Sequence, residues 1–263
     1  MKDIIDSLNL PKQILEKTEE LLKTLFGPAT KEVGELFADK VRYRRLKNQD
    51  QIFHKTVSLL EKNNLKPKEL NLKTLVPLIE ECSLEEDELL QEKWSNLLAN
   101  LATSPENGLE AKLVKTLSNL TPLEAQILDF AYNQMQIGRD KLIEQRKRWK
   151  GLFDEEEIKS IKIDEIIIDF NEVKKHFTID SIFLIISIEN LALLGLLKYE
   201  EPEITIDDNS SSGEIVEDKE KERKIELELD VSASYSQSNN FRITHFGGFF
   251  IEKCNAPIIK GNS

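Results

Sequence analysis

The chain has 263 residues, of which 40% are hydrophobic and 32% are charged, a composition typical of a soluble, helix-rich globular protein. No apolar run approaches the ~20 residues that a membrane span requires, and the first residues lack the basic and apolar regions of a signal peptide. The two cysteines are far apart and show no CxxC spacing, so we expect reduced thiols in a cytoplasmic protein without membrane contact.

The net charge of −12 belongs to the C-terminal part of the chain. Residues 1–150 hold 24 Lys and Arg against 24 Asp and Glu, whereas residues 151–263 hold 12 against 24. An acidic surface repels phosphate backbones, so this distribution disfavours nucleic-acid binding by the C-terminal part.

The N-terminal part has the pattern of helices joined by short loops. Apolar spacing predicts a helix from Pro11, a long helix from Pro28 to about Asn63, a short or kinked element over Leu72–Glu81 around Pro77, and a helix over Leu109–Leu120. Short connections favour antiparallel neighbours, and residues 1–120 are therefore predicted to form an α-helical bundle.

The strongest helix signal lies between residues 83 and 101. Ser83 and Glu86 have the spacing of a capping box, and the carboxylates at 85–88 suit the positive end of the helix dipole. Apolar residues then follow one stripe, at Leu90, Trp94, Leu97, Leu98 and Leu101. The stripe predicts a helix on which others pack, with Trp94 in the core.

The C-terminal part begins with a second capping box, Thr121 with Glu124, and a polar stretch follows at 138–163. Beyond it the patterns predict a strand over 165–169 and helices over 171–177 and 180–194, the second of which stops at Gly195. Two strands, over 203–207 and 224–231, are expected to flank a disordered segment at 208–223. The pattern over 241–254 predicts a strand and then a short helix. This order is typical of a winged helix-turn-helix.

The predicted fold class is therefore mainly α. It combines the N-terminal α-helical bundle with a C-terminal winged-helix-like α+β domain over residues 121–263, with insertions near 138–163 and 207–223.

The candidate binding surface is a basic cluster in the long helix, formed by Lys40, Arg42, Tyr43, Arg44, Arg45 and Lys47. Cations around a tyrosine suit phosphate contact and base stacking. Acidic residues at 35, 39 and 50 lie at helical spacing from several of these cations, which favours a solvated, salt-bridged helix instead. We retain the six residues as candidate partner-binding positions, together with the surface near Trp94.

The third helix of the predicted winged module argues against DNA recognition. No Lys or Arg occurs between Phe177 and Leu197, whereas Asp180 and Glu189 are acidic. A helix that enters the major groove gains from phosphate contacts that this one lacks. A protein-interaction or structural role is favoured.

No motif for catalysis or metal binding occurs. The carboxylates at 85–88 have no histidine nearby, and His54, His176 and His245 are isolated in sequence. Phosphate-binding glycine loops and nucleophile elbows are absent. We expect no catalytic residues, no cofactor and no metal, while a catalytic site assembled from distant residues stays an open alternative.

The positions of Trp, Pro and Gly in two segments resemble those of the abortive-infection alpha (Abi-alpha) family of bacterial proteins. The segments are Phe26–Gln49 and Leu75–Asn100, the second of which is followed by Leu120–Ala125. The ending Arg242–Cys254 also resembles that family, so the similarity spans about residues 26–254. The resemblance implies a role in defence against phage, in which an infected cell stops growing or dies before progeny emerge. It carries over no catalytic residues.

These observations lead to three hypotheses. The leading one is a non-enzymatic interaction or sensing protein of phage defence that contacts a host or phage protein, with oligomerisation left open. The second is a nucleic-acid-binding regulator that uses the basic helix at 40–47, and the third is a toxic hydrolase with a dispersed site. Steeply salt-dependent binding to a duplex would favour the second hypothesis over the first.

Overall fold

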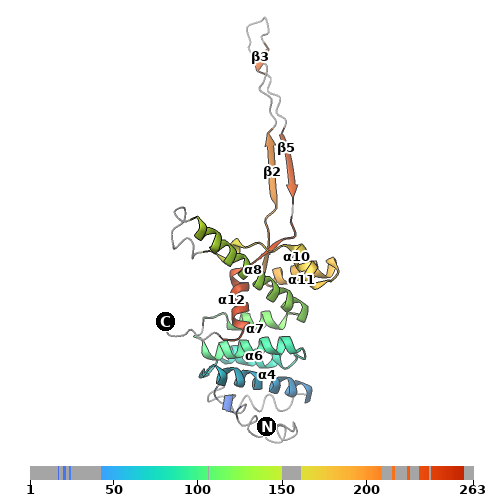
Figure 1. The fold of residues 1–263 in the computed structure, drawn as a ribbon. Helices are drawn as coiled ribbons and strands as arrows, with labels where there is room; N and C mark the ends of the chain where they lie inside the picture. The colour runs from blue at the N-terminus through green and yellow to red at the C-terminus, as the bar shows by residue number, and fades with distance from the viewer. Residues whose placement is uncertain are drawn as a thin grey trace.

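A computed structural model describes residues 17, 20, 21, 24, 43–105, 107–149, 161–208, 215–216, 224–225, 231–236 and 238–257. The chain is mainly helical, as predicted. In Figure 1 the helices are stacked along one axis, from α4 and α6 through α7 and α12 to α8. The helices α10 and α11 project to one side of α8, and the hairpin of β2 and β5 extends away from the helices.

The first group of helices comprises α4 (Tyr43–Lys62), α5 (Leu72–Cys82), α6 (Glu88–Thr103) and α7 (Glu110–Ser118). Helix α6 packs against α4 on one side and α12 (His245–Cys254) on another. Its predicted apolar stripe is buried along its whole length, and Trp94 is only 1% exposed. The prediction of a central, packed helix is confirmed.

The predicted capping box at the start of this helix is wrong. Helix α6 begins after Asp87, whose Oδ1 accepts hydrogen bonds from the amides of Leu89 (3.0 Å) and Leu90 (3.1 Å). Ser83 instead follows the end of α5, where its hydroxyl donates to the Glu80 carbonyl at 2.6 Å. The Ser-x-x-Glu spacing occurs at the end of one helix, and an equally good N-cap lies four residues later.

Two further helices depart from the expected outline. Helix α5 continues through Pro77 as one helix of 11 residues. Helix α8 (Pro122–Arg148) starts with the predicted Thr121–Glu124 capping box, which is confirmed, and runs well into the stretch expected to be an insertion at 138–163. Inside that stretch a Cβ on Gly138 would lie 2.8 Å from Cγ2 of Ile166, so the helix packs closely against the segment that follows.

After α8 the chain forms a short 3₁₀ helix, η3 (Ile163–Glu165), and then α10 (Phe170–Phe177) and α11 (Ser181–Leu193). The strand predicted over 165–169 is reduced to a single bridge between Ile168 and Phe241. The predicted stop at Gly195 is confirmed, because this residue has φ +75° and its amide donates to the Ala192 carbonyl at 2.9 Å.

The strands form three antiparallel pairs. They are β1 (Leu197–Tyr199) with β6 (Phe241–Ile243), β2 (Glu203–Asp208) with β5 (Val231–Ser236), and β3 (Ile215–Val216) with β4 (Lys224–Ile225). In the β1–β6 pair Leu197 lies opposite Ile243, and in the β2–β5 pair Glu203 lies opposite Ser236. The strand expected at 203–207 is confirmed, whereas the partner expected at 224–231 pairs with it only from Val231 onward. Most of the segment expected to be disordered, 208–223, lies outside the described residues.

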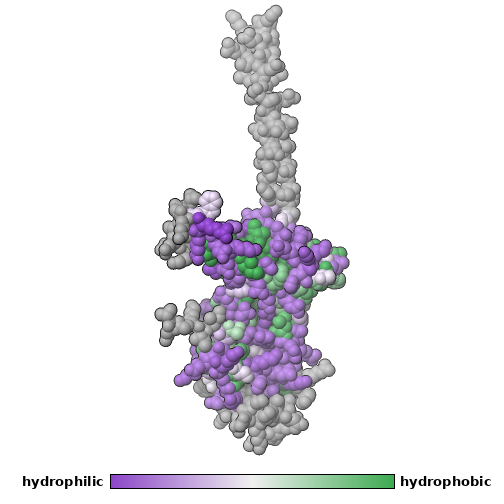
Figure 2. All heavy atoms as spheres, viewed as in Figure 1, coloured by the Kyte–Doolittle hydropathy of each residue, from purple (hydrophilic) through white to green (hydrophobic). Residues whose placement is uncertain are grey.

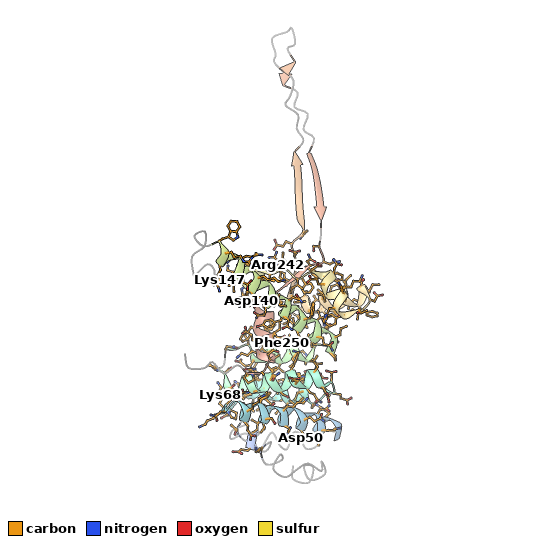
Figure 3. The ribbon with its side chains drawn as sticks, viewed as in Figure 1. Asp50, Lys68, Asp140, Lys147, Arg242 and Phe250 are labelled. Atoms are coloured by element: carbon orange, nitrogen blue, oxygen red, sulfur yellow. The ribbon has the colours of Figure 1, made fainter. Side chains whose placement is uncertain are left out.

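The last helix, α12, contacts both α6 of the first group of helices and α8. Phe250 of this helix is 1% exposed and lies between the first group of helices and α8 (Figure 3). Asn100 of α6 donates through Nδ2 to the carbonyls of Lys253 and Asn255, both at 2.9 Å, and Asn96 donates to that of Cys254 at 3.1 Å. Side chains of one helix thus satisfy the carbonyl end of another, which fixes α12 on α6.

An ion pair also links α6 directly to α8. Lys93 Nζ lies 2.7 Å from Asp129 Oδ1, and the Lys93 side chain is 8% exposed. Asp129→Ala would leave that ammonium buried without its partner, so we expect the free energy of unfolding to fall by about 2 kcal/mol in urea titrations. Glu81→Ala, which removes the looser pair with Lys115 (3.9 Å), is the control and should cost less than about 1 kcal/mol. Equal losses in both variants would contradict the prediction.

Candidate functional site

The basic cluster predicted from the sequence is only partly described. Lys40 and Arg42 lie outside the described residues, and the helix α4 begins at Tyr43, followed by Arg44. Lys47 is exposed to solvent.

Arg45, the remaining member, binds within the protein. Its Nε donates to Ser83 Oγ at 2.8 Å and its Nη2 donates to the Glu80 carbonyl at 3.4 Å. Asn48 and Gln49 extend this contact by donating to the carbonyls of Ser83 and Ile79, each at 3.1 Å. A guanidinium at a helix C-terminus is favourable, so this side of α4 caps α5.

The thiols and carboxylates have structural surroundings. Burial raises the pKa of Cys82 far above its usual range and that of Cys254 to about 12, so both thiols stay protonated and unreactive at neutral pH. Glu85, in the acidic run before α6, accepts the amide of Asp87 at 2.9 Å, and burial raises the pKa of its carboxyl group. Within the described ranges, no three His, Cys, Asp or Glu side chains gather in a group that could hold a metal ion.

The histidines lie on three separate helices. His54 belongs to α4, His245 begins α12, and His176 of α10 stacks on Phe130 with ring centroids 4.3 Å apart. Trp94, near which a partner surface was predicted, is in the core and presents no surface to a partner.

A surface that sequence analysis missed lies on α11. Four large apolar side chains are exposed there: Ile182 (65%), Phe183 (66%), Ile186 (53%) and Leu193 (86%). We call these four residues the α11 stripe. Apolar atoms are visible on the projection that α10 and α11 form (Figure 2). Exposed apolar residues gathered on one helix face indicate an interaction site.

The opposite side of the same helix faces the core. Leu184, Ile188 and Leu191 are fully buried and pack toward α8 and β1. Because α11 is apolar on nearly every side, its sequence alone does not distinguish the buried face from the exposed one. The signal that could have identified the stripe is this excess of apolar residues over what one buried face requires.

No single helix among the described residues is both long and apolar enough to cross a membrane. The helices α10 and α11 reach the required length and apolar content only when counted together, and they meet at a bend of 119°.

A family model described as abortive infection alpha matches residues 38–254, which is most of the chain. No curated protein and no solved structure matches.

Proposed function

Because the chain belongs to the abortive infection alpha family, we propose that it defends bacteria against phage as a non-enzymatic protein that contacts a host or phage protein. The family description supports the defence role. The single observation that supports contact with a protein is the α11 stripe, an apolar surface that has no partner within the described structure.

We assign the elements from α8 to β6 to a winged-helix-like module in which α11 is the third helix. The order α8, α10, α11, β1, hairpin and β6 supports this assignment, as does the antiparallel pairing of β1 with β6. In DNA-binding members of this class the third helix enters the major groove. Here its exposed residues are apolar or, as at Glu189, acidic, which favours a protein over a polyanion.

The basic cluster of α4 supports nucleic-acid binding less well than the α11 stripe supports protein binding. Arg45 already binds the end of α5, and a phosphate contact would have to replace those hydrogen bonds. The acidic composition of residues 151–263 also opposes association with nucleic acid.

Infection and turnover assays together test this proposal. Phages from a panel should form fewer plaques on bacteria that express the chain than on bacteria with an empty vector. The purified protein should show no nuclease, NTPase or NADase turnover and no duplex binding that falls steeply with salt. A reproducible turnover abolished by one substitution, or tight duplex binding lost in Arg44→Glu/Arg45→Glu, would contradict it.

A further inference from the structure

We propose that the α11 stripe binds an amphipathic helix of a partner protein, and that Lys or Arg residues flank the apolar face of that helix. This inference rests on the proposed function, since it assumes that the chain acts by contacting proteins. It adds the surface that makes the contact and the chemistry that the partner must bring.

The geometry of α11 suits helix-on-helix binding. Ile182, Ile186 and Leu193 follow at i, i+4 and i+11, so they lie along one side of the helix over about 16 Å, and Phe183 lies beside them. The helix is held at both ends, by the Asp180 carboxylate on the amide of Ile182 (2.7 Å) and by the stop at Gly195. An apolar row on one helix packs against the apolar row of a second helix, as in helix pairs and coiled coils.

The charge of the partner follows from Glu189. This exposed carboxylate lies at i+7 in the same row, between Ile186 and Leu193. No described residue forms an ion pair with it, and Lys198, the cation of β1, is paired with Glu201 at 2.9 Å. Burial, and then the negative charge of Glu189, raises the pKa of the Tyr199 phenol, so this charge lies close enough to β1 to act on Tyr199.

A partner that covers the stripe must also cover this carboxylate. Removing a charge from water is costly unless a counter-charge replaces the lost solvation. A Lys or Arg beside the apolar face of the incoming helix would supply that counter-charge and would fix its register. The partner is therefore expected to be both apolar and basic at this surface.

The same feature disfavours two other occupants. If two copies of the chain paired through α11, they would bury two Glu189 side chains and bring no Lys or Arg from residues 177–197. An anionic membrane surface would be repelled by Asp180 and Glu189, and by the acidic C-terminal part that carries them.

The test uses the full chain and three synthetic helical peptides, with binding followed by fluorescence anisotropy. The first has a leucine face flanked by lysines, the second has glutamates in place of the lysines, and the third keeps the lysines but has serines in place of the leucines. We expect the first to bind at least about tenfold more tightly than either other peptide. Glu189→Lys should reverse the preference between the lysine and glutamate peptides.

Variants of exposed residues locate the binding surface. Ile186→Asp should abolish binding of the leucine–lysine peptide, whereas Leu84→Asp, at a 62% exposed leucine before α6, should leave it unchanged. Circular dichroism melting checks that both variants fold. Equal weakening by the two variants, or equal binding of the serine peptide, would show a merely electrostatic attraction and overturn the proposal.

Other outcomes identify the competing occupants. A dimer seen by sedimentation and lost in Ile186→Asp would assign the stripe to a second copy, and flotation with vesicles that is lost in the same variant would assign it to a membrane. Each overturns the inference. If the wild-type chain protects against phage and Ile186→Asp protects equally well, the defence role stands and the inference about the stripe fails.

Discussion

Replacing Trp94 by alanine is expected to lower the free energy of unfolding by about 3–5 kcal/mol, the usual cost of deleting a buried tryptophan side chain. Trp94 is 1% exposed and lies on α6, which packs against both α4 and α12. Neither neighbour can move into the cavity without losing its own contacts. Asn96 and Asn100 fix α12 on α6, and the Ser95 hydroxyl of α6 donates to the Ile52 carbonyl of α4 at 3.2 Å. The cavity should therefore stay largely open.

The chain provides a matched control in its other tryptophan. Trp149 follows α8 and is 64% exposed, so Trp149→Ala should change the stability by no more than about 0.5 kcal/mol. Urea titrations followed by far-ultraviolet circular dichroism measure both variants. A loss below about 1 kcal/mol in Trp94→Ala would show that α6 is not the packed centre of the molecule.

Local sequence signals predicted those parts of the fold that depend on neighbouring residues. The Thr121–Glu124 box, the stop at Gly195 and the stripe on α6 each rest on contacts within about one to three helical turns. The order of helices and strands after residue 163 was also largely predictable, because period-two alternation marks β2 and helical spacing marks α10 and α11.

Features set by distant contacts were not predictable. The start of α6 was misplaced because Asp87 and Ser83 are both good N-caps. The structure places Ser83 at the end of α5, where its hydroxyl accepts from Arg45, a residue 38 positions away in sequence. The capping of α12 by Asn100 joins residues more than 150 positions apart in sequence. A single sequence carries no signal for such a pair.

The candidate site shows the same limit. The absence of Lys and Arg from α11 can be read directly from the sequence, because it depends only on which residues the helix contains. Which side of α11 is exposed depends on how the helix rests on α8 and β1. The α11 stripe therefore became visible only in three dimensions.

The position of α11 depends in turn on a close approach at the start of α12, and Gly247→Ala should disrupt it. A Cβ on Gly247 would lie 2.1 Å from the carbonyl oxygen of Leu196, the residue before β1. That oxygen also accepts the amide of Thr244 at 3.0 Å, and the Thr244 hydroxyl donates to the Gly195 carbonyl at 2.5 Å. Because the obstacle is backbone, we expect a loss of about 3 kcal/mol in urea titrations.

The neighbouring glycine separates this clash from a general effect of alanine in α12. A Cβ on Gly248 would meet only the side chain of Ile163, whose Cδ1, the end of a flexible side chain, would lie 3.0 Å away. Alanine also favours helix over glycine by up to about 1 kcal/mol, so Gly248→Ala should be neutral or mildly stabilising. Since Gly247 contacts the chain segment that ends α11, Gly247→Ala should also weaken binding of the leucine–lysine peptide, whereas Gly248→Ala should not. Equal stability of the two variants would mean that α12 does not hold the end of α11 in place.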